Sequence, residues 1–303
     1  MTNGTIGTEG VRPATLELPG AAIVYDIRDA DREDEVPVLL MIGSPMDASG
    51  FSTLAGHFPD RTVATYDPRG VSRSVREDGA TWSTPDEHAD DLHRLIAALD
   101  AGPVDVFASS GGAVNALELV ARHPEQVRTL VAHEPPLASA LADRAEALAA
   151  VVNVRDTYER EGLGPAMAKF IGLTMIQGPV PAAFGDAAPD PAAFGLPTED
   201  DGSRDDPMVG GHIVAVTHHE LDYDALRGAS TRIVVAAGAE SEHTITYRAA
   251  VAVAEGLGTE AVIFPSHHAG FLGGEFGQQG DPDAFAERLR EVLAEEGYVG
   301  RCQ

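Results

Sequence analysis

Residues 103–112 read Pro-Val-Asp-Val-Phe-Ala-Ser-Ser-Gly-Gly, and this segment is the most informative about the architecture of the chain. Its first half has the apolar residues of a short buried strand, and a helical pattern begins directly after it. A serine between a strand and a helix can occupy a strained turn if the residues two before and two after it are small. Ser110 has alanine and glycine at those positions, whereas Ser109 would place the Phe107 ring in the first of them. Ser110 is therefore the predicted nucleophile.

The composition is that of a globular chain without a nucleic-acid or membrane partner. Of the 303 residues, 44% are hydrophobic and 23% are charged, so we expect a sizeable core in one large domain or one domain with an insertion. The formal net charge of −27 would repel phosphate backbones and anionic lipid surfaces. Cys302 is the only cysteine, which excludes an internal disulfide.

Targeting and membrane signals are absent from the sequence. No apolar run approaches the roughly 20 residues that span a bilayer. The N-terminal residues include Glu9 and Arg12 and lack the apolar segment of a signal peptide. We therefore expect a cytoplasmic protein.

Strands and helices alternate on both sides of residues 103–112. Besides the strand before Ser110, apolar runs predict strands at residues 14–18, 21–27, 36–42, 61–66, 127–132, 231–237 and 260–264. Helical patterns lie at residues 48–57, 85–99, 113–123, 245–257 and 282–295. This alternation predicts an α/β fold with a mostly parallel, doubly wound sheet of eight strands.

The alternation is interrupted between residues 139 and 225. The outer parts of this segment have helical patterns, while its middle, residues 178–210, is dense in Pro, Gly, Ala and Asp and is typical of a loop. We interpret residues 139–225 as a helical cap, or lid, inserted into a core domain formed by residues 1–138 and 226–303.

Four motifs, in this order along the chain, resemble those of the α/β-hydrolase superfamily. Residues 40–45, Leu-Met-Ile-Gly-Ser-Pro, look like the family's oxyanion loop, and residues 66–74, Tyr-Asp-Pro-Arg-Gly-Val-Ser-Arg-Ser, look like its Asp-x-Arg-Gly turn. The strand, serine and helix around Ser110 resemble the nucleophile elbow. Residues 267–271, His-His-Ala-Gly-Phe, look like the histidine loop. The resemblance covers about residues 14–296 apart from the cap, and implies an α/β-hydrolase fold.

A serine hydroxyl is a weak nucleophile at neutral pH, so it needs a base within hydrogen-bond reach and an acid that orients that base. The resemblance assigns the base to His268, which precedes a small pair of residues, and leaves His267 as the alternative. Asp67 and Arg69 of the second motif are expected to brace their own turn rather than to act in catalysis.

The acid departs from the family pattern. The position from which the family usually takes it is Ser241, which cannot serve, and the neighbouring Glu240 and Glu242 could reach in only from a reshaped turn. Some haloalkane dehalogenases take the carboxylate from the end of the strand after the elbow helix. That position is Glu134 here, and the extra methylene of a glutamate helps it to span the distance. We favour Glu134 and keep Glu240 as the alternative acid.

Two backbone N–H groups should stabilise the tetrahedral oxyanion. One is the amide of Gly111, at the start of the helix, where the helix dipole also helps. Because Pro45 has no N–H, the second is assigned to Ser44. Ile42 stands where the family often has a histidine that braces this loop.

The cap contains His212, His218, His219 and Glu220, a set that invites a metal hypothesis. His218 and His219 are adjacent, and adjacent helical side chains point about 100° apart, so the pair cannot chelate from one face. We expect no metal and no cofactor.

These residues predict a serine hydrolase of the esterase type, acting on an ester, lactone or thioester of a small neutral or apolar molecule. A homodimer is a possible assembly. One alternative is cofactor-independent chemistry on the same fold, such as C–C bond cleavage or a lyase, cyclase or perhydrolase reaction. Another is a ligand-binding protein without enzyme activity.

Overall fold

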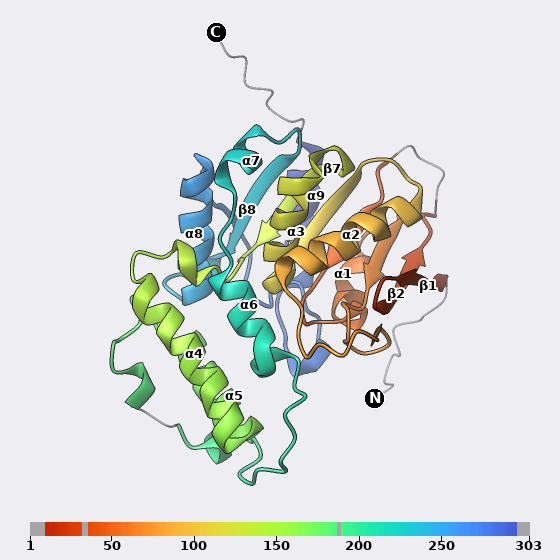
Figure 1. The fold of residues 1–303 in the computed structure, drawn as a ribbon. Coiled ribbons are helices and arrows are strands. Elements are labelled where there is room, and N and C mark those ends of the chain that lie inside the picture. The colour runs from red at the N-terminus through yellow and green to blue at the C-terminus, as the bar shows by residue number, and fades with distance from the viewer. Residues whose placement is uncertain (1–9, 32–35, 187–188, 296–303) are drawn as a thin grey trace, which may run out of the picture.

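A mostly parallel sheet forms the centre of the computed structural model, which describes residues 10–31, 36–186 and 189–295 (Figure 1). In this part of the chain the sheet has nine strands in the order β1-β2-β4-β3-β6-β7-β8-β9, with β5 paired to β2. The strands are β1 Val11–Leu18, β2 Ala21–Arg28, β3 Leu39–Ile42, β4 Val63–Tyr66, β5 Val75–Arg76, β6 Val104–Ser109, β7 Val127–His133, β8 Arg232–Gly238 and β9 Val262–Phe264. Strands β1 and β2 are antiparallel, and the strands from β4 to β9 along the sheet are parallel.

All eight predicted strands are present, and the prediction of a doubly wound sheet is confirmed. The ninth strand, β5, was missed because two residues are too few to form a pattern. The strand predicted from Val36 begins only at Leu39, and the Val36 side chain is 43% exposed. Cys302 lies outside the described residues.

The helices lie on both faces of the sheet (Figure 1). They are α1 Ser52–Gly56, α2 Pro85–Leu99, α3 Gly111–Arg122, α4 Arg144–Glu161, α5 Leu163–Thr174, α6 Ile213–His218, α7 Tyr223–Gly228, α8 Ile245–Leu257 and α9 Pro282–Ala294. Leu40 and Ile42 belong to the core that contains α2, α3 and α8, while Leu39 and Met41 belong to the core that contains α1 and α9. Successive residues of a strand face opposite sides, so the apolar run of β3 supplies both cores.

Local signals set the bounds of the best-predicted helices. Helix α2 begins and ends where the pattern places it, and the Thr84 side chain accepts a hydrogen bond from the Glu87 amide at its start. Thr244 caps α8 in the same way. A capping side chain satisfies an N–H that has no partner inside the helix, so it marks a boundary that periodicity alone leaves open.

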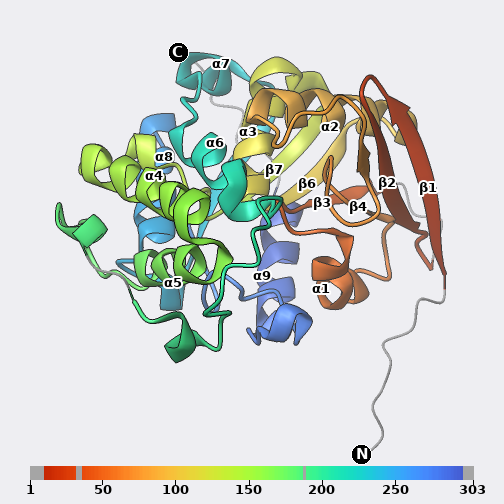
Figure 2. The same ribbon diagram turned by 60° about the horizontal axis from the view of Figure 1, so that its bottom comes forward.

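Helices α4, α5 and α6 lie together beside the sheet, between β7 and β8 in the chain (Figures 1 and 2). Ala147, Val151, Leu173 and Ile213 from these helices pack in one apolar cluster with Ile245 of α8. This cluster attaches the segment to the core. The predicted cap boundaries at 139 and 225 stay a prediction.

The helix predicted over residues 211–222 is wrong in detail. A π-helical turn, Met208–His212, leads into α6, which ends at His218. His219 has the extended angles φ −59° and ψ 141°, and its carbonyl accepts the Ser139 hydroxyl at 2.6 Å. A tertiary hydrogen bond to the chain after β7 thus accompanies the end of the helix. None of the helices in the described ranges combines the length and the hydrophobicity of a membrane-spanning segment.

Candidate active site

Ser110 occupies a strained turn between β6 and α3. Its backbone has φ 56° and ψ −129°, in the positive-φ region that residues with a side chain rarely adopt. The Ser110 amide donates to the carbonyl of His133 at 3.0 Å, and the Ser110 carbonyl accepts the amide of Ala113 at 2.9 Å. The neighbouring strand and the first turn of α3 therefore hold the strained residue from both sides.

The glycines after Ser110 allow residues 42–44 to approach closely. A Cβ atom on Gly112 would lie 2.5 Å from the carbonyl oxygen of Ile42, and one on Gly111 would lie 2.6 Å from that of Ser44. Both contacts are with backbone atoms, which cannot swing aside. The small-residue requirement that identified Ser110 therefore has its physical cause in the packing of the turn against residues 42–44.

His268 lies against Glu134, which comes directly after the end of β7. The Nδ1 atom of His268 is 2.6 Å from Oε2 of Glu134. The Glu134 side chain is fully buried, whereas that of His268 is 39% exposed. Oε1 of Glu134 accepts the Gly238 amide at 2.8 Å, and Oε2 also accepts the Thr246 hydroxyl at 2.9 Å. The carboxylate is therefore held by groups from three separate segments.

The surroundings of Glu134 keep it ionised. Burial by itself raises the pKa of a carboxyl group, but the hydrogen bond and charge of His268 oppose it, with smaller contributions from His133 and the Gly238 amide. The balance lowers the pKa of Glu134 to about 2. A buried carboxylate that is ionised at neutral pH can orient the His268 ring and stabilise its protonated form.

The alternative site residues are placed differently. His267 has its Nε2 atom 3.2 Å from the carbonyl of Gln279, and its Nδ1 accepts the amide of Ala269 at 3.1 Å. Glu240 lines the same cavity as Ser110 and His268, and its amide donates to the carbonyl of Ser266. The Glu242 carboxylate lies 3.8 Å from the ring of His243.

A cavity of about 470 Å³ brings the predicted residues together. Ser110, His268, Ser44 and Gly111 all line it, with Ser110 at the turn and His268 from the loop after β9. The rest of the wall is mainly apolar and comes largely from the helices between β7 and β8; it includes Val151, Phe170, Leu173, Met208, Ile213 and Val216. Gly111 is the first residue of α3, where backbone N–H groups and the helix dipole favour negative charge.

Sequence reasoning missed two contributors to this region. Thr246 binds Glu134, but a threonine early in a helix carries no sequence signal for that role. His212 was considered only as a metal ligand, yet it lies on the cavity wall beside Ser44 and Gly111. Both come from segments more than 100 positions after the residues they contact, so only the folded chain reveals them.

The other two histidines of the proposed cap, His218 and His219, contact different groups. The Nε2 atom of His219 lies 3.0 Å from a carboxylate oxygen of Glu118 on α3, and Nδ1 of His218 lies 3.1 Å from the hydroxyl of Thr217. Within the described ranges, no three His, Cys, Asp or Glu side chains are arranged to hold a metal ion.

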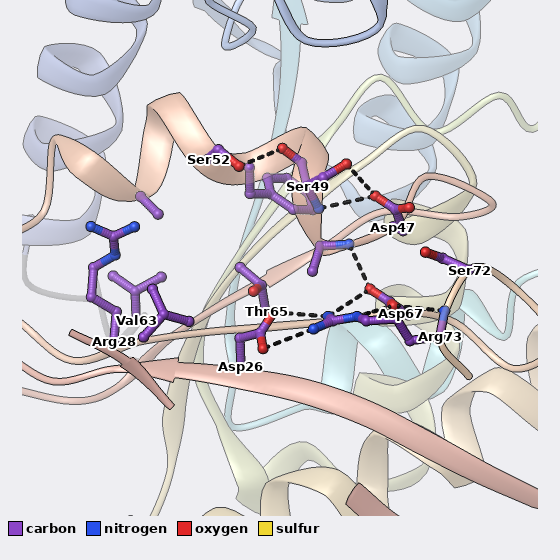
Figure 3. Close-up of a pocket in the computed structure, with 14 residues that line it drawn as sticks. Asp26, Arg28, Asp47, Ser49, Ser52, Val63, Thr65, Asp67, Ser72 and Arg73 are labelled. Carbon is purple, nitrogen blue, oxygen red and sulfur yellow. Dashed lines mark hydrogen bonds and ion pairs between the residues drawn. The ribbon is translucent and has the colours of Figure 1, made fainter. Parts of the chain in front are cut away.

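A second cavity, of about 350 Å³, lies against β2, β4 and the short helix Ala48–Phe51 (Figure 3). Arg73 joins two of its carboxylates: Nε of Arg73 donates to Asp67 at 2.7 Å, and the Arg73 guanidinium also binds Asp26. None of the described residues that line it is a histidine. This cavity therefore lacks the base that serine chemistry needs, and Asp67 braces its loop.

The turn of residues 66–74 is braced as expected, but with different partners. Asp67 accepts the Ala48 amide at 3.0 Å and pairs with Arg73, not with Arg69. Arg69 instead binds Asp91 of α2 through two hydrogen bonds, of 2.9 and 2.5 Å. The turn is thus fastened at two points, to the helix at Ala48–Phe51 and to α2.

Known proteins resemble this chain in sequence and in fold. Residues 36–270 match a family model described as alpha/beta hydrolase fold. The "Uncharacterized hydrolase YraK" of Bacillus subtilis (strain 168) is 30% identical over 292 residues, which cover 94% of this chain and 97% of that protein.

Solved structures extend the comparison. The enol-lactonase from Burkholderia xenovorans LB400 matches with a TM-score of 0.63 at 17% identity, over 93% of this chain and 100% of that one. A thermophilic esterase from Thermogutta terrifontis matches with a TM-score of 0.63 at 19% identity, over 93% and 98% of the two chains. At such low identity these two structures show a shared fold.

Proposed function

The chain belongs to the alpha/beta hydrolase family, and on that premise we propose that it is a serine hydrolase cleaving an ester, lactone or thioester of a small neutral or apolar molecule. The observation that carries the proposal is the His268–Glu134 pair, which adjoins the same cavity as the strained Ser110. A nucleophile, a base and an orienting acid are the three groups that acyl transfer to serine requires.

The reaction has two halves. The Ser110 hydroxyl attacks the carbonyl carbon while Nε2 of His268 takes its proton, and Glu134 holds the Nδ1–H side of the ring. The Ser44 and Gly111 amides stabilise the oxyanion of the tetrahedral intermediate. His268 then gives the proton to the leaving alcohol or thiol, and an acyl-enzyme remains. Water, deprotonated by His268, releases the acid and restores Ser110.

The cavity supports the substrate class. Its volume of about 470 Å³ suits a small molecule, and most of the apolar side chains in its wall come from the segment that we propose as the cap. The formal net charge of −27 disfavours polyanionic substrates. The lactonase and esterase with a similar fold are compatible with ester or lactone chemistry.

A serine-directed fluorophosphonate probe tests the proposal. The wild-type protein should be labelled and should hydrolyse nitrophenyl acetate or butyrate, and Ser110→Ala should abolish both. Ser109→Ala is the matched control, because Ser109 is buried in β6 and its hydroxyl faces His133 at 3.3 Å. An unlabelled wild type, or a labelled Ser110→Ala variant, contradicts the proposal. Labelling without turnover of any ester would favour non-hydrolytic chemistry on the same triad.

A further inference from the structure

The imidazole ring of His212 lies where the turn at Ser110 and Gly111 contacts the loop at Ser44. It ends the π-helical turn Met208–His212, and its residue is only 5% exposed. The turn packs tightly on the loop before α2: a Cβ atom on Gly211 would lie 2.5 Å from the ring of Trp82, a residue that is itself 51% exposed. The backbone that carries His212 is therefore held in place from outside the segment.

The His212 ring and the Ser44 carbonyl meet at Gly111. A Cβ atom built on this glycine would lie 2.6 Å from Nε2 of His212 and equally 2.6 Å from the carbonyl oxygen of Ser44. The absence of a side chain at position 111 is what allows the imidazole and the Ser44 carbonyl to approach each other. Gly111 and Ser44 are the two residues whose amides we assign to the oxyanion.

The Nε2 atom of His212 is buried and makes no hydrogen bond with the described residues. A buried polar group without a partner destabilises the folded chain, so an apolar residue would be the more stable choice unless the group is used. Burial also lowers the pKa of His212 to about 4, against a smaller opposite effect of the Ser44 carbonyl. At neutral pH the ring is therefore uncharged and carries one N–H.

We propose that His212 is a positioning residue for the oxyanion loop, whose Nε2–H donates to the Ser44 carbonyl oxygen when substrate is bound. This inference rests on the proposed function. Hydrogen bonds at such sites are often long in the free enzyme and tighten in the reacting complex. Holding the Ser44 carbonyl fixes the backbone of Ser44, so its amide keeps its aim at the oxyanion. The segment between β7 and β8 then takes part in catalysis and does more than enclose the substrate.

Two substitutions of His212 distinguish the loss of its hydrogen bond from the loss of its packing. His212→Leu fills much of the same space without a donor, whereas His212→Gln places an amide N–H near the position of Nε2. We expect His212→Leu to lower kcat for a nitrophenyl ester by about 10- to 100-fold with KM changed by less than about 3-fold, because losing a direct oxyanion donor costs about 10²–10³. His212→Gln should recover most of kcat. The rate of fluorophosphonate labelling should follow kcat.

His218 provides the control, because it ends α6, the helix that directly follows His212, and its ring faces Thr217. His218→Leu and His218→Gln should leave kcat unchanged. An unchanged kcat in His212→Leu overturns the inference. A loss in His212→Gln as large as that in His212→Leu also overturns it, because the role would then be packing alone.

An NMR measurement on the wild-type protein tests the inference even if the His212→Leu variant does not fold. In wild-type protein bound to a phenylboronic acid, which mimics the tetrahedral intermediate, NMR should show an exchange-protected imidazole N–H that is absent from His212→Gln. Failure to find this signal counts against the inference. A wild type that the fluorophosphonate does not label overturns the proposed function and this inference together, whereas labelling with unaltered His212 variants overturns only the inference.

Discussion

Oε2 of Glu134 lies 2.6 Å from Nδ1 of His268, although 134 positions separate the two residues in the chain. The first residue follows β7 and the second lies in the loop after β9, so β8 stands between their strands in the sheet. The carboxyl ends of parallel strands meet at one edge, and loops from separate strands can therefore face each other there. The contact depends on the sheet order and on the reach of a glutamate side chain.

The two candidate acids should differ sharply when each loses its charge. Glu134→Gln keeps the shape but removes the carboxylate that faces His268, so we expect kcat to fall by about 10³–10⁴-fold. Glu240→Gln should change kcat by less than about 3-fold, because its side chain is not hydrogen-bonded to His268 in the structure. Steady-state kinetics on one nitrophenyl ester compare the two. A larger loss in Glu240→Gln would move the acid to that residue.

Substitutions of the adjacent residues His267 and His268 should have different effects on kcat in the same assay. His268→Ala removes the proposed base and should lower kcat by at least about 10³-fold. His267 is bonded to backbone groups of its own loop, at Gln279 and Ala269, so His267→Ala should mainly lower the melting temperature. Equal losses of kcat in two variants that fold as well as the wild type would contradict this assignment.

The Thr246 hydroxyl should affect kcat indirectly, by orienting the carboxylate of Glu134. Thr246→Val removes the donor at 2.9 Å from Oε2, which lies beside His268, and leaves the carboxylate less well oriented. We expect a fall in kcat of about 3- to 10-fold, corresponding to about 1 kcal/mol for one hydrogen bond to a charged group. Thr259→Val, beyond the other end of α8, is the control and should not affect kcat. If both variants behave alike, Thr246 does not act on the site.

The elbow should not tolerate a methyl group two residues after Ser110. In Gly112→Ala the new Cβ atom would lie 2.5 Å from the Ile42 carbonyl, so the turn or β3 must move. We expect about 1–3 kcal/mol loss in the free energy of unfolding, together with loss of activity. Gly228→Ala, where a Cβ atom meets open space, should be neutral. Urea unfolding measures both, and an unchanged midpoint in Gly112→Ala would contradict the packing described here.

Stability should fall as the pH is lowered below 6.5, because three histidines are buried uncharged. Burial lowers the pKa of His88 to about 3, and those of His133 and His212 to about 4, from an ordinary value of 6.5. The unfolded chain binds protons at these rings between pH 6.5 and 4 while the folded chain does not. The free energy of unfolding should therefore decrease by up to about 4 kcal/mol per pH unit in that window.

Urea midpoints at pH 6.5, 5.5 and 4.5 test this dependence. The lowered pKa of Glu134 makes the free energy of unfolding depend on pH only near and below the ordinary carboxyl pKa of about 4.5. It therefore does not contribute to the pH dependence in the upper part of the window. The variant His133→Gln should take up about one proton fewer on unfolding. A midpoint that stays constant from pH 6.5 to 4.5 would show that the rings are accessible to protons in the folded protein.

Part of the proposed site could be predicted from the sequence because it depends on local geometry. Ser110 could be proposed as the nucleophile because the size limits at a strand-to-helix turn involve residues within two positions of the serine. The eight longer strands and helices α2 and α8 could be placed because apolar periodicity and capping residues are also local. The helix predicted over residues 211–222 failed because a hydrogen bond from Ser139 accompanies its end.

The amino-acid sequence by itself thus determined the fold class and the proposed nucleophile, since both depend on patterns a few residues long. Only the tertiary structure decided which carboxylate faces His268, because Glu134 and Glu240 differ in distance through space and not in any local pattern. The tertiary structure likewise decided the places of Thr246 and His212, each of which lies more than 100 positions along the chain from the residues that it adjoins. Their places depend on how the sheet orders its strands and on how the helices between β7 and β8 pack against it.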